Sequence, residues 1–244
     1  MLNDTCVPRR SAPARLSLGT AAGVGLVLLI AISAVLGAGL VPWAHMWLLA
    51  VAVYFSCKCL TWWDATRASE SAPIGRSLAY LLLWPGMDAR SFLFCPPPTV
   101  RPSRTQWFNA CAKSALGAAL FWGIARLAWP GHDLVVGWIG MVGLIFLLHF
   151  GSFDVLALLW QRVGLDARPI MHSPIVSTSL AEFWGRRWNM GFRSLGHRFI
   201  YGPLHGRLGV AGATMAVFIA SGLVHDLVIS LPAGAGFGLP TSTS

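Results

Sequence analysis

Two short stretches in the last third of the chain hold the side chains best suited to chemistry. One runs Ser179-Leu-Ala-Glu-Phe-Trp-Gly-Arg-Arg-Trp-Asn189 and combines carboxylate, guanidinium, indole and carboxamide groups. The other is His225, the single ionisable residue in an apolar run that ends before Asp226. An imidazole can move a proton near neutral pH, and an ionisable group inside a membrane is a functional candidate by default. Proton transfer at His225 is therefore the first hypothesis.

The first stretch has the pattern of a short amphipathic helix. Ser179 and Glu182 have the spacing of a capping box, which predicts that a helix begins here. At 100° per residue, one stripe of this helix holds Glu182, Arg186 and Asn189. The roughly opposite stripe holds Leu180, Trp184 and Trp188. We expect the helix to lie at a membrane interface. The alternative is that it only caps a helix bundle, with Glu182 and Arg186 forming an i, i+4 pair worth a few tenths of a kcal/mol.

His225 lies on a face of small and polar residues. Thr214, Ser221 and His225 fall within one narrow stripe, and Gly222 lies beside them. This face should point into a bundle, where small residues allow close helix packing. The imidazole needs a hydrogen-bond partner there, so His225 is either a reactive group or a histidine satisfied by Ser221 or by a neighbouring helix.

Other patterns of reactive residues narrow the function. His149 and Asp154 are five residues apart, so they do not share a helical face, although both could line a cavity. The sequence contains no His-x-x-His or Cys/His cluster, so we expect no metal site. It also contains no Gly-x-Ser-x-Gly motif of serine hydrolases and no phosphate-binding loop. No nucleic-acid-binding module is recognisable, and we expect no nucleic-acid partner.

The elements that must position these residues are membrane helices. The 244 residues are 55% hydrophobic and 11% charged, unlike a soluble domain. A bilayer needs about 20 mostly apolar residues per helix. We predict an all-α, polytopic bundle in one domain, residues 1–244, with a shorter interfacial or re-entrant segment over 77–85. The five predicted spans are 17–41, 42–63, 109–129, 134–160 and 210–231.

The distribution of positive charge predicts the orientation. Of the 18 Lys and Arg residues, three precede the first span, five lie between the second and third, and seven lie between the fourth and fifth. The positive-inside rule then places the N-terminus and the motif loop, residues 161–209, in the cytoplasm. The net charge of +9 is explained by topology. We expect a multi-pass protein of the plasma or inner membrane if bacterial, or of the endoplasmic reticulum if eukaryotic.

The two stretches together resemble the membrane-bound O-acyltransferase (MBOAT) superfamily. The resemblance rests on Phe183-Trp-Gly-Arg-Arg-Trp-Asn189, followed by Ser-Gly-Leu-Val-His225 inside an apolar span. It is greatest to the wax-synthase-like branch, which joins a fatty acyl group from acyl-CoA to a long-chain alcohol. Two further stretches fit that branch, Tyr80-Leu-Leu-Leu-Trp-Pro-Gly-Met-Asp88 and Leu231-Pro-Ala-Gly-Ala-Gly-Phe-Gly-Leu-Pro240.

The resemblance implies a role for each residue. It makes His225 the catalytic base and Asn189 its partner, which orients the alcohol or donates to the oxyanion. It implies acyl-CoA as co-substrate, a lipid alcohol as acceptor, surrounding membrane lipids and no cofactor. The residues expected to bind substrate are Arg186, Arg187, Trp184, Trp188, Glu182 and Ser221. The two arginines would meet CoA phosphates, although a lipid headgroup is an equal alternative for Arg187, and the tryptophans would line the acyl path or pack at the interface.

The resemblance leaves alternatives. Members of the family usually continue with apolar spans after the histidine helix, whereas 19 residues follow His225, so we expect a C-terminally truncated form. The preferred function is wax ester synthesis. The alternatives are another acceptor (acetyl transfer to an alcohol, or a glycerolipid), a non-catalytic membrane protein in which His225 and Asp154 form a polar pathway, and an inactive remnant.

Overall fold

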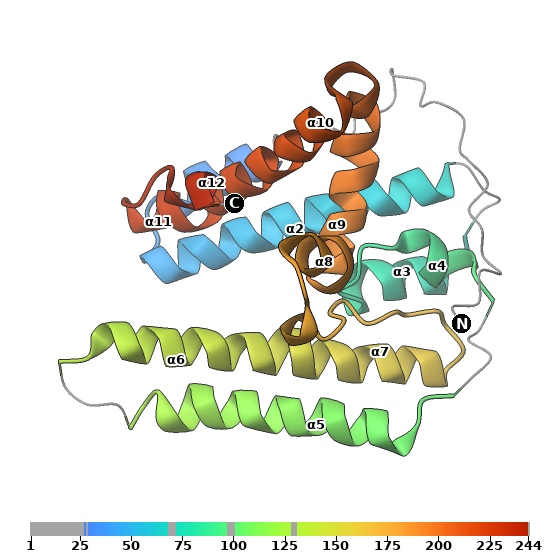
Figure 1. The fold of residues 1–244 in the computed structure, drawn as a ribbon, viewed down its shortest axis with the longest axis horizontal. Coiled ribbons are helices and arrows are strands. Elements are labelled where there is room, and N and C mark those ends of the chain that lie inside the picture. Colours follow the sequence, from blue (N-terminus) through green and yellow to red (C-terminus); the bar gives the residue numbers. More distant parts are fainter. Residues whose placement is uncertain (1–26, 28, 68–71, 97–100, 128–130, 244) are drawn as a thin grey trace. The chain divides into compact units, whose positions relative to one another are not determined.

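All regular elements of the described chain are helical. The computed structural model describes residue 27 and residues 29–67, 72–96, 101–127 and 131–243, and no strand occurs among them (Figure 1). The predicted all-α class is confirmed. Within these ranges the chain forms two compact units, residues 72–191 and residues 29–67 together with 192–243.

Within the described ranges, three helical stretches are long and apolar enough to cross a membrane. They are Pro42–Thr66, Asp133–Arg162 and Met190–Ala233. Each exceeds the roughly 20 residues that a bilayer requires. The protein is therefore an integral membrane protein built from helices.

Three of the five predicted spans coincide with these helices. The spans over 42–63, 134–160 and 210–231 fall within the three long helices. The predicted span 109–129 corresponds to a helix over 104–124, which is not among the three. Span 17–41 lies partly outside the described residues, because 17–26 and 28 are not among them. The segment over 77–85 overlaps a short apolar helix, Ile74–Leu83, and its interfacial or re-entrant position stays a prediction. The total of five spans stays a prediction.

The unit of residues 72–191 begins with two short helices, α3 (Ile74–Leu83) and α4 (Ala89–Phe94). α3 ends where Trp84 turns extended, because the residue before a proline disfavours helical geometry. The ring of Phe92 lies 5.8 Å from that of Tyr80 and 5.5 Å from that of Trp160. Tyr80 and Phe92 are completely buried, so aromatic packing holds the two helices on the following bundle.

A helical hairpin follows. Its first arm is α5 (Arg104–Ala118) with η1 (Ala119–Ile124), and its second arm, coloured yellow-green in Figure 1, is antiparallel to it. Gly117 allows the backbones to touch, because a Cβ added there would lie 2.2 Å from the backbone nitrogen of Leu147. Lys113 and Asp154 also join the arms, with 3.4 Å between Nζ and Oδ2. The second arm comprises α6 (Asp133–Ile145), η2 (Phe146–Ser152) and α7 (Phe153–Arg162).

The other unit contains α2 (Pro42–Thr66) and the C-terminal helices. Asp64, near the end of α2, is 5% exposed, yet it is paired with two arginines. Arg198 donates from Nη2 to Oδ1 at 2.9 Å, and Arg67 Nη2 lies 3.3 Å from the same oxygen. A buried carboxylate requires such partners, so this pair joins α2 to the helix that carries Arg198.

The stretch Met190–Ala233 is bent rather than straight. Gly209 has φ 67° and ψ −173°, a backbone conformation that only glycine adopts readily. After the bend, the helix packs against the stretch that precedes it. A Cβ added at Gly196 would lie 3.0 Å from Val217 Cγ1. This stretch begins at Met190, within the predicted motif loop of residues 161–209. Its elements are α9 (Met190–Gly196), η5 (His197–Tyr201), α10 (Gly202–His225), η6 (Asp226–Ser230) and α11 (Leu231–Ala233), followed by α12 (Leu239–Thr243).

Candidate active site

The motif helix begins at the residue that the sequence predicts. Ser179 is the N-cap of α8 (Leu180–Glu182), and its Oγ accepts a hydrogen bond from the Glu182 N–H at 3.1 Å. In a capping box, the Glu182 carboxylate would accept a hydrogen bond from the Ser179 N–H. Here it accepts from the Thr178 N–H instead. The predicted helix start is confirmed.

The helix then widens into a π-helical turn, η4 (Phe183–Arg187). The Trp188 N–H donates to the Phe183 carbonyl at 2.8 Å, a bond that closes five residues back instead of four. This turn changes which side chains meet. Arg187 Nη2 lies 2.6 Å from Glu182 Oε1. The alternative pairing of Glu182 with Arg186 is therefore replaced by a pair five residues apart, which the wider turn brings together.

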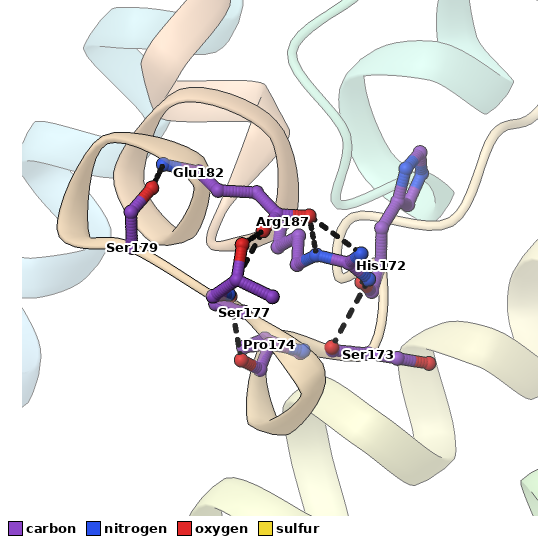
Figure 2. A network of polar contacts seen from close by, with 8 residues as sticks. His172, Ser173, Pro174, Ser177, Ser179, Glu182 and Arg187 are labelled. Carbon is purple, nitrogen blue, oxygen red and sulfur yellow. Dashed lines mark hydrogen bonds and ion pairs between the residues drawn. The ribbon is translucent and has the colours of Figure 1, made fainter.

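Figure 2 shows the polar network built on this pair. Glu182 Oε2 accepts from the backbone N–H and the hydroxyl of Thr178, at 2.8 and 2.7 Å. Arg187 Nη1 donates to the His172 carbonyl at 3.2 Å. The hydrogen bonds from Thr178 and then from Arg187 lower the pKa of Glu182 to about 2. Both Glu182 and Arg187 are therefore engaged within the protein, a role that their spacing did not predict.

Asn189 follows this turn in an unusual conformation. Its φ is 40°, the left-handed region, which asparagine tolerates better than most residues. The flanking backbone pairs with an earlier segment: His172 N–H donates to the Arg187 carbonyl at 2.8 Å, and Met190 N–H donates to the Ile170 carbonyl at 2.9 Å. The Asn189 N–H points to Met171 Sδ at 3.1 Å. Residues 170–172 thus support the backbone that presents Asn189.

The aromatic residues of the motif form one cluster. Phe183 stacks on Trp188 with ring centroids 5.3 Å apart, and Trp184 meets Phe183 edge-on at 4.9 Å. Trp188 also contacts Phe150 of η2 at 6.4 Å. Trp188 is therefore a packing residue between the motif and the hairpin, whereas Trp184 is 44% exposed.

Arg186 differs from its neighbour. Its side chain is exposed, while that of Arg187 is folded onto Glu182. Of the two arginines expected to meet an anionic substrate, Arg186 is the one that projects from the network. A guanidinium in this position can form charge-assisted hydrogen bonds to phosphate.

His225 is the last residue of α10. Its Nδ1 lies 2.8 Å from the Ser221 backbone carbonyl. A carbonyl only accepts, so this bond requires the proton on Nδ1 and leaves the Nε2 lone pair free in the neutral ring. His225, Ser221 and Thr214 are exposed within the described structure, whereas the neighbouring Gly222 is buried. Of the face predicted to point into a bundle, Gly222 is therefore buried, whereas the side chains of Thr214, Ser221 and His225 are not.

Asp226, next to His225, has a role that its position in the sequence did not indicate. Its Oδ1 accepts from Ser230 Oγ at 2.9 Å and from the Gly238 N–H at 3.0 Å. Thr241 Oγ1 donates to the other oxygen. Asp226 therefore ties the segment up to α12 onto the helix that carries His225, and it is not the group that orients the imidazole.

The remaining polar candidates have other partners. Asp154 pairs with Lys113, and His149 meets the Phe153 ring edge-on at 5.3 Å. In the ranges that the structure describes, no three His, Cys, Asp or Glu side chains form a group that could hold a metal ion. Asn189 belongs to the unit of residues 72–191, and His225 belongs to the other unit.

Part of this chain is similar in sequence to known acyltransferases. Residues 167–236 match the model of the family described as membrane bound O-acyl transferase. The long-chain-alcohol O-fatty-acyltransferase of Simmondsia chinensis is 37% identical over 73 residues, which cover 27% of this chain and 21% of that protein. The acyl-CoA–sterol O-acyltransferase 1 of Arabidopsis thaliana is 32% identical over 71 residues, covering 26% and 21%.

These matches cover only part of each protein. The chain spans about a fifth of the length of these two relatives. No solved structure matches it. The matched segment nevertheless contains the network of Figure 2, Asn189, the bend at Gly209 and His225. Residues 167–236 of this chain are therefore similar to the membrane bound O-acyl transferase family.

Proposed function

We propose that this protein transfers a fatty acyl group from acyl-CoA to a long-chain alcohol. The observation that carries the proposal is the bond from His225 Nδ1 to the Ser221 carbonyl, which leaves Nε2 as a free base on a membrane helix within the family-matched segment. The family and the names of the relatives support acyl transfer to an alcohol.

The proposed reaction is direct transfer between the two substrates. His225 Nε2 takes the proton of the alcohol as its oxygen attacks the thioester carbonyl carbon. The carbonyl oxygen becomes negative in the tetrahedral intermediate, and the Asn189 carboxamide donates to it or orients the alcohol. The C–S bond then breaks, the imidazolium returns the proton to the leaving thiolate, and the products are an ester and free CoA.

The other motif residues support this chemistry in different ways. Arg186 meets the phosphates of CoA through its exposed guanidinium. Glu182 and Arg187 act as positioning residues, because their pair fixes the turn that leads into Asn189. The exposed face of Trp184 borders the acyl chain, and Ser221 acts through its backbone carbonyl.

In the proposed topology the N-terminus and the motif segment face the cytoplasm. The arginines between the predicted fourth and fifth spans support this orientation by the positive-inside rule. Acyl-CoA would then arrive from the same side. The proposal includes five spans, of which three correspond to helices of suitable length and composition.

The test uses membranes containing the full chain, labelled palmitoyl-CoA and hexadecanol. We expect labelled ester from the wild type, loss of at least about 10²-fold for His225→Ala, and unchanged activity for the exposed control His132→Ala. Normal ester formation by His225→Ala would remove the proposed base. Absence of ester from the wild type with every acceptor tried would favour the non-catalytic alternative.

A second acceptor is supported by the sterol-named relative. Membranes supplied with equal amounts of hexadecanol, a sterol and a diacylglycerol would identify the preferred acceptor from the ester produced. Acetyl-CoA offered against palmitoyl-CoA would test the donor in the same way. We expect the hexadecanol ester of palmitate to dominate; a sterol ester, glycerolipid or acetate product would redefine the substrates.

A further inference from the structure

The surface of the helix before Gly209 carries positive charge without any acidic residue. Between Met190 and Leu208 the chain has three arginines and two histidines, and Asp and Glu are absent from the whole of 190–225. The stretch 210–225 after the bend has no Lys or Arg either, as expected of a membrane span. The bend therefore separates a cationic helix from an apolar one.

Four residues of the cationic helix form a continuous stripe. Arg193, His197, Tyr201 and His205 follow one another at intervals of four, and we call them the cationic stripe. The rings of His197 and Tyr201 stack 5.0 Å apart, and those of Tyr201 and His205 stack 5.1 Å apart. The stack holds both imidazoles in fixed positions along one face.

The π-helical turn η5 keeps these residues aligned. In an α-helix, residues four apart drift by roughly 40° per step, so a stripe of four gradually turns away. The Gly202 N–H bonds to the His197 carbonyl, five residues back, and this wider turn offsets the drift between His197 and Tyr201.

The arginines of this helix differ in their partners. Arg198 is bonded to the buried Asp64, whereas Arg193, His197 and His205 are exposed. Arg207 is also exposed, but it lies two residues after His205 and therefore on a different side of the helix. The cationic stripe itself contains one guanidinium, two imidazoles and a phenol hydroxyl, all of which can donate hydrogen bonds to phosphate, and Arg207 adds a second guanidinium near the bend.

We propose that the cationic stripe and Arg207 bind the phosphate headgroups of anionic membrane lipids. Charge complementarity selects this ligand, and the apolar helix after Gly209 provides a surface for its acyl chains. An anionic headgroup near the membrane surface gains about 1 kcal/mol per basic residue, which corresponds to about fivefold in affinity. This site lies outside the groups assigned to acyl transfer.

The test measures lipid selectivity in phosphatidylcholine vesicles containing the full chain. The probe is spin-labelled phosphatidylglycerol, with spin-labelled phosphatidylcholine as reference, and the readout is the motionally restricted fraction of each. We expect the selectivity for phosphatidylglycerol to fall about fivefold for each of Arg193→Gln and Arg207→Gln. Arg162→Gln, an exposed arginine at the end of α7, is the matched control and should retain wild-type selectivity.

Two further variants test the stack. Tyr201→Phe keeps the ring and should retain most of the selectivity, whereas Tyr201→Ala should reduce it. An equal loss in Arg162→Gln, or no loss in the double variant R193Q/R207Q, would overturn the proposal. Competition by millimolar inorganic phosphate would show a free-phosphate site and would overturn the lipid assignment. None of these measurements requires acyl transfer, so they stand apart from the test of the proposed reaction.

Discussion

The carboxylate of Glu182 and the guanidinium of Arg187 lie 2.6 Å apart across a turn of five residues. The pair is partly exposed, with 23% and 26% of the two side chains accessible. Its effect is geometric: it closes the π-helical turn after which the backbone of Asn189 becomes left-handed. A pair that fixes backbone geometry predicts kinetic behaviour different from that of a substrate ligand.

The first prediction separates Arg187 from Arg186. We expect Glu182→Gln and Arg187→Gln to lower kcat by a similar factor, on the order of tenfold, with little change in KM for acyl-CoA, since both disturb the placement of Asn189. Arg186→Gln should instead raise KM for acyl-CoA. Steady-state kinetics with palmitoyl-CoA provides the measurement. A rise in KM for Arg187→Gln without any effect of Glu182→Gln would make Arg187 a phosphate ligand.

The second prediction concerns pH and the same pair. The pKa of Glu182 falls from 4.5 to about 2, so its contribution to stability is complete above pH 4.5 and is lost as the pH falls towards 2. Thermal unfolding in detergent should therefore show wild type more stable than Glu182→Gln at pH 6. The difference should shrink between pH 4.5 and 2. A constant difference over that range would contradict the depressed pKa.

The third prediction tests the backbone of Asn189. Glycine accepts φ 40° without strain, whereas alanine in the left-handed region costs roughly 1–2 kcal/mol. Asn189→Gly should therefore match the wild type in thermal stability, and Asn189→Ala should be less stable by about 1 kcal/mol. Both should lose on the order of 10²-fold in kcat if the carboxamide acts in the reaction. An active Asn189→Gly would leave only the backbone conformation as the role of this residue.

The fourth prediction concerns the close helix contact at Gly117. A methyl group there would lie 2.2 Å from the Leu147 nitrogen, so Gly117→Ala must push the two arms of the hairpin apart. We expect a loss of about 1–3 kcal/mol in stability. Gly123→Ala in the same arm is the control, because nothing lies within 4 Å of its Cβ position. Equal unfolding midpoints for the two variants would contradict the described packing.

The fifth prediction concerns the buried carboxylate of Asp64. Arg198→Gln removes its principal partner and should cost about 2 kcal/mol, less than a fully buried pair because Arg198 is 40% exposed. Arg193→Gln, an exposed arginine of the same stretch, should change the thermal midpoint little. If the two variants have the same thermal midpoint, Arg67 alone is a sufficient partner for the buried Asp64 carboxylate.

Features that depend on composition and local pattern could be predicted from the amino-acid sequence. Long apolar runs predict membrane helices because a bilayer accepts little else, and this placed the helices over 42–63 and 134–160. Ser179 marked a helix start because its hydroxyl can cap one. The motifs around Asn189 and His225 indicated a resemblance to the membrane bound O-acyl transferase family, and the model of that family matches residues 167–236.

The pairing of specific side chains follows only from the packed structure. A 100° rotation per residue assigned Glu182 to Arg186, but the π-helical turn gave it Arg187, and no local pattern distinguishes the two windings. Asp64 and Arg198 are far apart in the chain, and their pairing depends on how α2 packs with the later helix. The exposure of His225 likewise depends on neighbouring elements. Contacts between distant residues arise from packing, which short-range spacing does not encode.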